Sequence, residues 1–431
     1  MKLKIYGFIL LLFFSAQIHA VLNISITQGV ESASPIAIIP FAWSSSPVLV
    51  DADVSNIVTL DLARSGKFSP MPVEDLIAKP AKPEDVHFNT WRVAGIDHVV
   101  IGSVEKQAEN QFQVKFRLFD VFKGEQVLGY SIPATRESLR SVSHKISDYI
   151  LESITGLKGA FDTRIVYVTS QQTDKKIQYR LQVADTDGYN PQTLLTSDEP
   201  IMSPTWSPDG SHLVYVSFEK GHSEIYSHNI YTAKREKISS YAGINGAPEW
   251  SPDGTRLALT LSKDGNADVY VMSLADKKLT RITRHWAIDT EATWMPDGKS
   301  LVFTSSRSGK PQLYKIAIDG DSRPQRLTFE GDYNANATIS NDGTMIAFVQ
   351  GYKNSFKIAV LHTETRLIQT LTDGPLDESP EFAPNSSMIL YASQKQGQAI
   401  LAAVSTDGGH KQQLMLSDGE VREPSWASSK K

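Results

Sequence analysis

The second half of the chain contains short runs in which nearly every residue is apolar, and the runs recur at regular intervals. A strand covered on one side alternates apolar and polar residues, whereas a strand packed on both faces is apolar throughout. The pattern therefore predicts strands in sheets that are sandwiched between neighbouring sheets. The runs are Leu213–Val216, Leu257–Thr260, Leu301–Thr304, Ile346–Val349 and Ile389–Ala392.

A corner motif precedes each of these strands and sets the repeat length. In Trp-Ser-Pro-Asp-Gly, the Ser, Pro and Gly occupy positions i, i+1 and i+3 of a type I turn, where each is favoured. A repeat of about 44 residues is typical of one four-stranded propeller blade, so six copies predict six blades. The motif or a weaker form of it begins at Trp206, Trp250, Trp294, Ile339, Phe382 and Trp426, with spacings of 44, 44, 45, 43 and 44 residues.

The two ends of the repeat region complete each other. Arg164–Val168 resembles a second strand with no inner strand before it, and Glu423–Trp426 resembles an inner strand with nothing after it. Pairing them would close the ring and remove exposed strand edges. We therefore predict an all-β six-bladed propeller at residues 161–431. Its third and fourth strands are expected at Glu224–Tyr226, Asp268–Val271 and Gln312–Lys315, and at Glu236–Ile238, Leu279–Ile282 and Gln325–Leu327.

Residues 34–160 lack the repeat and predict a small α/β domain. A strand is expected at Ile36–Phe41, followed by a helix that carries Val54, Ile57, Val58 and Leu62 and stops near Gly66. Strands are then expected at His98–Val104, Phe112–Leu118 and Gln126–Ile132. A last helix is indicated by Leu139, Val142, Ile146, Ile150 and Ile154, with Gly156 as its C-terminal cap.

The N-terminus predicts export. Lys2 and Lys4 precede an apolar run of about ten residues, which is typical of a secretory signal and too short to span a bilayer. We expect residues 1–20 to be a cleaved signal peptide and residues 21–33 to be an arm that pairs with a partner or with the protein's own sheet. The chain has no Cys, which excludes a lipid-modified Cys, a disulfide and a thiolate metal site.

The sequence offers no catalytic signature, and we predict that the protein is not an enzyme and needs no cofactor or metal. A Gly-x-Ser-x-Gly elbow is missing, and the nearest fragment, Gly221–Ile225, lacks the second Gly. Asp185–Gly188 lacks the Glu that a calcium loop requires and is expected to be a β-turn. His222 and His228 share a blade and are expected at the surface. A net charge of −5 without a basic block gives no footprint for nucleic acid or anionic lipid.

Surface recognition remains, and the repeat locates it. The segments before the corner motifs are expected to be loops that converge on one face around the central channel. Two residues before each motif, a small residue or Pro is expected to let the strands approach the axis. Polar residues three and five positions before the motif have no such packing role, and we expect them to contact a partner. The segments are Pro200–Thr205, Asn245–Glu249, Asp289–Thr293, Asn334–Thr338, Asp377–Glu381 and Val421–Ser425.

The whole chain resembles the TolB family, the periplasmic components of the Tol-Pal system. The most specific matching segments are the arm Val21–Gln28, the strand Pro35–Phe41, Asn245–Pro248 before a Trp-Ser-Pro-Asp-Gly corner, and Thr290–Glu291 before the next. The resemblance implies a monomer in the periplasm, without membrane insertion. It also implies a role in outer-membrane integrity and in envelope constriction during cell division.

The resemblance implies two partners. The propeller face would bind the peptidoglycan-associated lipoprotein Pal, and the arm would bind TolA. Ile244, which stands where the family carries His, would contact Pal together with Ala247 and Thr290. The full set of expected contacts is Ile244, Asn245, Ala247, Thr290, Glu291, Asn336 and Glu423 for Pal, and Leu22, Asn23, Ile24 and Ile26 for TolA.

Two other classes of function stay open at this stage. One is a secreted propeller enzyme, a polysaccharide lyase or a peptidase, with its site in the central channel. It would need a cluster of His, Asp, Arg or Lys side chains that point inward. The other is a structural scaffold with unrelated partners.

Overall fold

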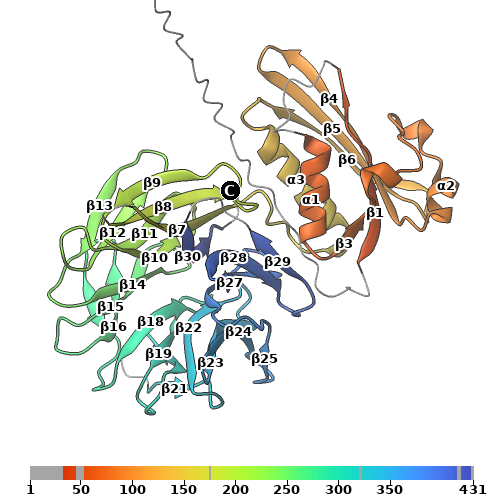
Figure 1. Ribbon diagram of the computed structural model, residues 1–431. Coiled ribbons are helices and arrows are strands. Elements are labelled where there is room, and N and C mark those ends of the chain that lie inside the picture. The colour runs from red at the N-terminus through yellow and green to blue at the C-terminus, as the bar shows by residue number, and fades with distance from the viewer. Residues whose placement is uncertain (1–32, 45–52, 174–175, 320–322, 415–418, 429–431) are drawn as a thin grey trace, which may run out of the picture.

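The computed structural model describes residues 33–44, 53–173, 176–319, 323–414 and 419–428. An α/β domain stands beside a propeller, and the chain passes from one to the other after the long helix α3 (Figure 1). No helix within these residues has the length and apolar character that crossing a bilayer requires. The predicted signal peptide and the predicted arm up to residue 32, with Leu22, Asn23, Ile24 and Ile26, lie outside the described residues.

The N-terminal domain is built on one mixed sheet with the strand order β3-β1-β4-β5-β6, and β2 also pairs with β4. Strands β1, β3 and β4 run parallel, whereas β4, β5 and β6 form an antiparallel meander. Its elements are β1 Ser34–Ile38, β2 Ala42–Trp43, α1 Val54–Arg64, β3 Phe68–Pro70, α2 Phe88–Val93, β4 His98–Ala108, β5 Gln111–Asp120, β6 Glu125–Ala134 and α3 Leu139–Thr155, with short 3-10 turns at Val73–Asp75 and Pro83–Asp85.

The predicted strands and helices of this domain are all present, with one shorter than expected. Strand β1 ends at Ile38 and not at Phe41, because Pro40 has no N–H to donate to the sheet. Helix α3 ends where predicted, with Gly156 in the left-handed conformation at φ 75°. The short elements β2, β3 and α2 were not predicted, since each spans too few residues to show a hydrophobic period.

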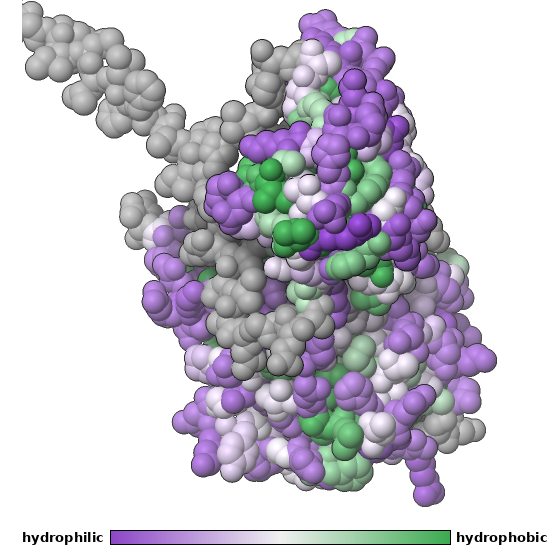
Figure 2. Space-filling model, turned by 90° about the vertical axis from the view of Figure 1, so that its right-hand side faces the viewer, coloured by the Kyte–Doolittle hydropathy of each residue, from purple (hydrophilic) through white to green (hydrophobic). Residues whose placement is uncertain are grey.

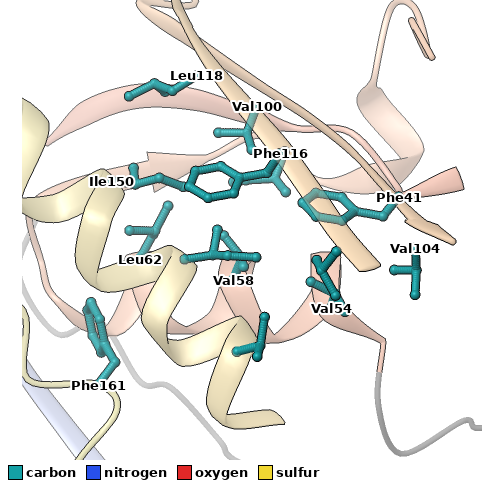
Figure 3. Packing of buried hydrophobic residues seen from close by; sticks show 14 of the residues in the cluster. Phe41, Val54, Val58, Leu62, Val100, Val104, Phe116, Leu118, Ile150 and Phe161 are labelled. Atoms are coloured by element: carbon teal, nitrogen blue, oxygen red, sulfur yellow. The ribbon is translucent and has the colours of Figure 1, made fainter. Parts of the chain in front are cut away.

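Alternation along the strands gives this sheet two buried faces. One face packs against α1 and α3, where Val58, Leu62, Phe116 and Ile150 meet (Figure 3). On the other face, α2 and its neighbouring loops bury Trp91. Figure 2 shows the side of the molecule that carries α2. Hydrophilic side chains on this side separate the hydrophobic ones into several patches.

The described part of the propeller consists of six four-stranded sheets around a ring, as predicted (Figure 1). From inner to outer strand, blade 1 consists of β10 Ile201–Trp206, β11 His212–Ser217, β12 Glu224–Asn229 and β13 Arg235–Ser239. Blade 2 consists of β14 Asn245–Trp250, β15 Arg256–Leu261, β16 Asp268–Ser273 and β17 Leu279–Arg281. Blade 3 consists of β18 Asp289–Trp294, β19 Ser300–Ser305, β20 Gln312–Ala317 and β21 Gln325–Arg326.

The second half of the ring repeats the same order of strands. Blade 4 consists of β22 Tyr333–Ile339, β23 Met345–Tyr352, β24 Ser355–His362 and β25 Ile368–Thr370. Blade 5 consists of β26 Glu378–Phe382, β27 Met388–Lys395, β28 Gln398–Ser405 and β29 Lys411–Leu414. Blade 6 consists of β30 Glu420–Trp426, β7 Arg164–Gln172, β8 Ile177–Asp185 and β9 Gln192–Ser197.

The corner turns and the ring closure follow the sequence analysis. In the first corner, the N–H of Gly210 donates to the carbonyl of Ser207 at 2.8 Å, as a type I turn requires. Blade 6 joins the two ends of the repeat region, because Trp426 pairs with Ile165 across β30 and β7. The C-terminal strand therefore closes the ring as predicted.

Buried charges connect the two domains. Arg64 of α1 pairs with Asp61 at 2.9 Å and donates to the hydroxyl of Thr186, also at 2.9 Å, in the turn after β8. Arg140 of α3 pairs with Asp187 of the same turn at 2.5 Å. Burial alone would lower the pKa of His144, but the Asp61 carboxylate at 2.7 Å outweighs it and raises that pKa. The domains thus meet through paired charges.

Candidate partner-binding site at the propeller channel

The segments before the corner motifs are the inner strands themselves and not the loops we expected. Pro200–Thr205, for example, lies almost wholly within β10, which pairs with β11. The stretch was mistaken for a loop because it carries Pro and small residues. The channel is consequently lined by strand backbone, which holds its side chains more rigidly than loops would.

A bulge interrupts every inner strand at the same place. The residue three positions before each motif has a positive φ, from 43° to 53°, and the register shifts around it in all six blades. The next residue is Pro in four blades, which a bulge tolerates because its N–H is not needed for pairing. The bulge places the residue three positions before the motif at the channel wall. The residues are Ser203, Ala247, Glu291, Asn336, Ser379 and Glu423.

The residues five positions before the motif have a structural role that the sequence analysis missed. Asn245 is fully buried; its side chain accepts from the hydroxyl of Ser239 at 2.6 Å and donates to the carbonyl of Tyr241 at 2.7 Å. Asp289 and Asn334 are also fully buried. The expectation that Asn245 presents its side chain to a partner is therefore wrong, because that side chain fixes the turn that leads into β14.

The bulge residues and their neighbours surround a cavity of about 550 Å³ in the channel. Two of the predicted contact residues hold consecutive blades together there. The carboxylate of Glu291 accepts from the N–H of Asn336 and from the hydroxyl of Thr304, both at 2.9 Å. In the same way, Glu423 of blade 6 accepts from the N–H of Ser203 in blade 1. These carboxylates face the channel and bind the backbone of the next blade at the same time.

A second pair of glutamates lines the cavity directly before the corner motifs. Burial raises the pKa of Glu249 to about 7, although Thr205 donates a hydrogen bond to it. Burial and the charge of Glu249 raise the pKa of Glu381 as well. Burial also raises the pKa of Glu423 to about 7, and it raises the pKa of Glu291. Burial therefore favours the protonated form of all four of these channel glutamates.

Three predicted residues lie at the mouth of this cavity. Ile244 is 51% exposed, and its N–H donates to the hydroxyl of Ser262 at 2.7 Å. Ala247 is the bulge residue of blade 2, and the hydroxyl of Thr290 lies 3.2 Å from that of Thr260. The structure brings Ile244, Ala247 and Thr290 together on one wall, with Glu291, Asn336 and Glu423 further around the same cavity.

Exposed apolar side chains on the same face were missed by the sequence analysis. Ile288 of blade 3 is equivalent to Ile244, because its N–H also donates to a serine hydroxyl after the second strand, and it is 55% exposed. Leu376 holds the same place in blade 5. Trp286, two residues before Ile288, is 79% exposed. Examining the sixth position before each motif would have found Ile244, Ile288 and Leu376 as a repeated apolar position.

The other candidate chemical groups have structural partners. The hydroxyl of Ser223 in the Gly221–Ile225 fragment accepts a hydrogen bond from the N–H of Asn245. His228 is buried near Tyr215, so its expected surface position is wrong, whereas His222 is exposed.

Among the described residues, one group of side chains of the kinds that bind metal ions lies close together. It consists of His144, Asp185 and Asp187. The guanidinium of Arg140 pairs with both carboxylates, at 3.5 Å and 2.5 Å, and already supplies the positive charge. The turn itself is the β-turn predicted for Asp185–Gly188, since the N–H of Gly188 donates to the carbonyl of Asp185 at 2.8 Å.

Known proteins resemble this chain along nearly its whole length. Family models described as "TolB amino-terminal domain" and "TolB beta propeller domain" match residues 22–127 and 151–430. Proteins named "Tol-Pal system protein TolB" from Xanthomonas oryzae pv. oryzae and Xanthomonas campestris pv. campestris are 56% and 55% identical over 94% of this chain and 92% of theirs. The crystal structure of TolB from Acinetobacter baumannii is 39% identical, with a TM-score of 0.86 over 95% of this chain and 100% of that one.

Proposed function

The chain belongs to the TolB family, a non-enzymatic periplasmic component of the Tol-Pal system, and from this premise we propose that it binds Pal through the channel face of its propeller. The observation that carries the proposal is the composition of that face. Exposed Ile244 borders a cavity whose wall contains Thr290 and the glutamates, and Ile288 is exposed at the equivalent position of the next blade. Apolar side chains that stand exposed beside polar groups on a folded surface are a mark of protein–protein interaction sites.

The second part of the proposal concerns the N-terminal arm. Residues 21–33, with Leu22, Asn23, Ile24 and Ile26, would bind TolA by adding a strand to its sheet, since the segment alternates apolar and polar residues. A protein that binds both partners would connect the outer-membrane lipoprotein to the inner-membrane protein. That connection would support outer-membrane integrity and envelope constriction during division. The protein would act as a monomer in this complex.

The test for the propeller face is a titration of purified Pal against two matched variants. Thr290→Arg places a bulky cation at the channel wall and should weaken Pal binding by about tenfold or more. Thr365→Arg makes the same change at an exposed turn between β24 and β25, at the opposite end of a blade, and should leave the affinity unchanged. Wild-type affinity in Thr290→Arg would exclude the channel face as the docking site.

The test for the arm is deletion of residues 21–32. The shortened protein should lose TolA binding, while Pal still binds because the propeller is intact. Unchanged TolA affinity after the deletion would refute the arm as the TolA-binding segment. The two parts of the proposal can therefore fail independently.

A further inference from the structure

A polar pocket of about 340 Å³ lies on the side of blade 5 that faces blade 4, apart from the channel cavity. Tyr391, Ser393 and Lys395 of β27 line it, together with Ala402 of β28. These residues share one face, because Tyr391 pairs with Ala402 across the two strands. Asp377, which precedes β26, lies at the base of the pocket and is 1% exposed.

The carboxylate of Asp377 is only half satisfied. Its Oδ1 accepts from the hydroxyl of Ser393 at 2.5 Å. Its Oδ2 has no hydrogen-bond partner in the part of the chain that the structure describes. Gly374 packs so closely that a Cβ there would lie 2.4 Å from Oδ1 and 2.7 Å from Oδ2. A buried carboxylate oxygen without a donor is costly, which makes this one a candidate for binding a donor from outside.

Blade 3 shows which group completes the same arrangement. Asp289 is the equivalent of Asp377, and Ser305 donates to its Oδ1 at 2.6 Å as Ser393 does in blade 5. The second oxygen of Asp289 accepts from the guanidinium of Arg307 at 2.7 Å. That guanidinium also lies 5.0 Å from the ring of Tyr314. Blade 3 therefore fills its own pocket with an arginine.

Two differences leave the pocket of blade 5 open. Ala402 stands where blade 3 has Tyr314, because Phe303 pairs with Tyr314 as Tyr391 pairs with Ala402. Lys395 occupies the position of Arg307, but its ammonium donates to the side chain of Gln413 at 2.6 Å and makes no contact with Asp377 that the structure records. Blade 5 thus keeps the carboxylate, the serine and one aromatic ring of blade 3, but it has no arginine at the position of Arg307.

We propose that this pocket binds a guanidinium group from another molecule in the place that Arg307 occupies in blade 3. The guanidinium would donate to Oδ2 of Asp377 and stack against Tyr391, since a planar cation suits both contacts. The pocket is large enough for a ligand of amino-acid size. The guanidinium can come from free arginine or from an arginine side chain of a protein. This proposal does not depend on the docking of Pal.

The experiment is a titration of the full mature chain with L-arginine and with L-citrulline, which has nearly the same shape without the charge. L-arginine should bind with a Kd of about 1 mM or tighter and citrulline at least about tenfold more weakly. A capped peptide with a central arginine distinguishes the two sources: binding of the peptide assigns the pocket to protein side chains, and binding of L-arginine alone assigns it to the free amino acid. If neither L-arginine nor the arginine peptide binds, the proposal is wrong.

Three variants connect the binding to this pocket. Asp377→Asn should weaken binding of L-arginine by about tenfold or more, because it removes the charge under the guanidinium. Ala402→Tyr should do the same by filling the space, and it keeps the fold testable if the Asp377 variant does not fold. Lys278→Ala changes an exposed lysine of blade 2 and should have no effect. Wild-type binding in Ala402→Tyr would overturn the assignment.

Discussion

The carboxylate of Glu291 accepts a hydrogen bond from the backbone N–H of Asn336 at 2.9 Å, and this contact joins the inner strands of two consecutive blades. Both residues occupy the bulge position and both have a φ of 52°. The same contact recurs between Glu423 and Ser203, where the last inner strand meets the first. The bulges therefore shape the channel wall and hold neighbouring blades in register.

We expect Glu423 to contribute to the closure of the ring. Glu423→Ala leaves the N–H of Ser203 without its acceptor and should lower the free energy of unfolding by about 1–3 kcal/mol. Glu423→Gln keeps a carbonyl acceptor and should cost less. Chemical denaturation of the three proteins measures the difference. If the alanine and glutamine variants are equally stable, the hydrogen bond does not hold the ring.

The acidic channel predicts a pH dependence of stability. Burial raises the pKa of Glu249 to about 7 in the folded protein, above the ordinary value of 4.5 for a glutamate side chain. A raised folded-state pKa gives a stabilisation that is fully present below pH 4.5 and is lost as the pH rises through 7. Glu249→Gln removes this loss and should raise the free energy of unfolding at pH 8, relative to wild type, by up to about 3 kcal/mol.

The measurement for this prediction is denaturation of both proteins at pH 5 and pH 8. The difference between Glu249→Gln and wild type should be larger at pH 8 than at pH 5, because only the carboxylate carries the cost of a buried charge. A difference that does not change with pH would mean that Glu249 is not desolvated in the channel.

Trp286 is expected to contribute strongly to Pal binding. It is 79% exposed on the face that carries Ile288, and exposed aromatic residues are frequent binding hot spots. Trp286→Ala should weaken Pal binding by about tenfold or more without changing stability. The matched control is Tyr231→Ala, an exposed aromatic residue in the turn between β12 and β13 at the opposite end of its blade. Equal loss in both variants would contradict a specific role for Trp286.

The contact between the domains predicts coupled unfolding. Arg140 pairs with Asp187 at 2.5 Å, and Arg140→Ala leaves that half-buried carboxylate to the N–H of Tyr189 and to His144 at 4.0 Å. Loss of one member of a fully buried ion pair costs about 3–5 kcal/mol, and the partial exposure of this pair lowers the expected cost to about 1–3 kcal/mol. Calorimetry should therefore show the α/β domain and the propeller unfolding at lower temperature or in separate transitions. An unchanged single transition would show that the pair does not couple the domains.

The propeller could be predicted from sequence because two independent signals repeat together. The corner turn requires Pro and Gly at fixed positions, and the strand after it is apolar on both faces, as at Leu213–Val216. The small elements of the N-terminal domain could not be predicted in this way. Strand β3 has three residues and α2 has six, which is too short for a hydrophobic period to emerge.

The sequence predicted that the named residues lie around the channel, but it did not predict the local structure that positions them. The bulge could not be found, because a positive φ at Glu291 or Ser203 leaves no mark when the residue is not Gly. Asn245 looked available for a partner because its hydrogen bonds to Ser239 and Tyr241 depend on the folded turn. Ile288 was missed because the apolar position lies one residue before the segment that we considered.

Hydrogen exchange of the protein with and without Pal measures the location of the docking site most directly. If Pal docks on the channel face, the segments that lead into the inner strands should be protected, at residues 241–247, 284–291 and 329–336. The corner turns on the opposite face, at residues 207–211 and 251–255, should not change. Protection confined to those corner turns or to the α/β domain would show that Pal docks elsewhere.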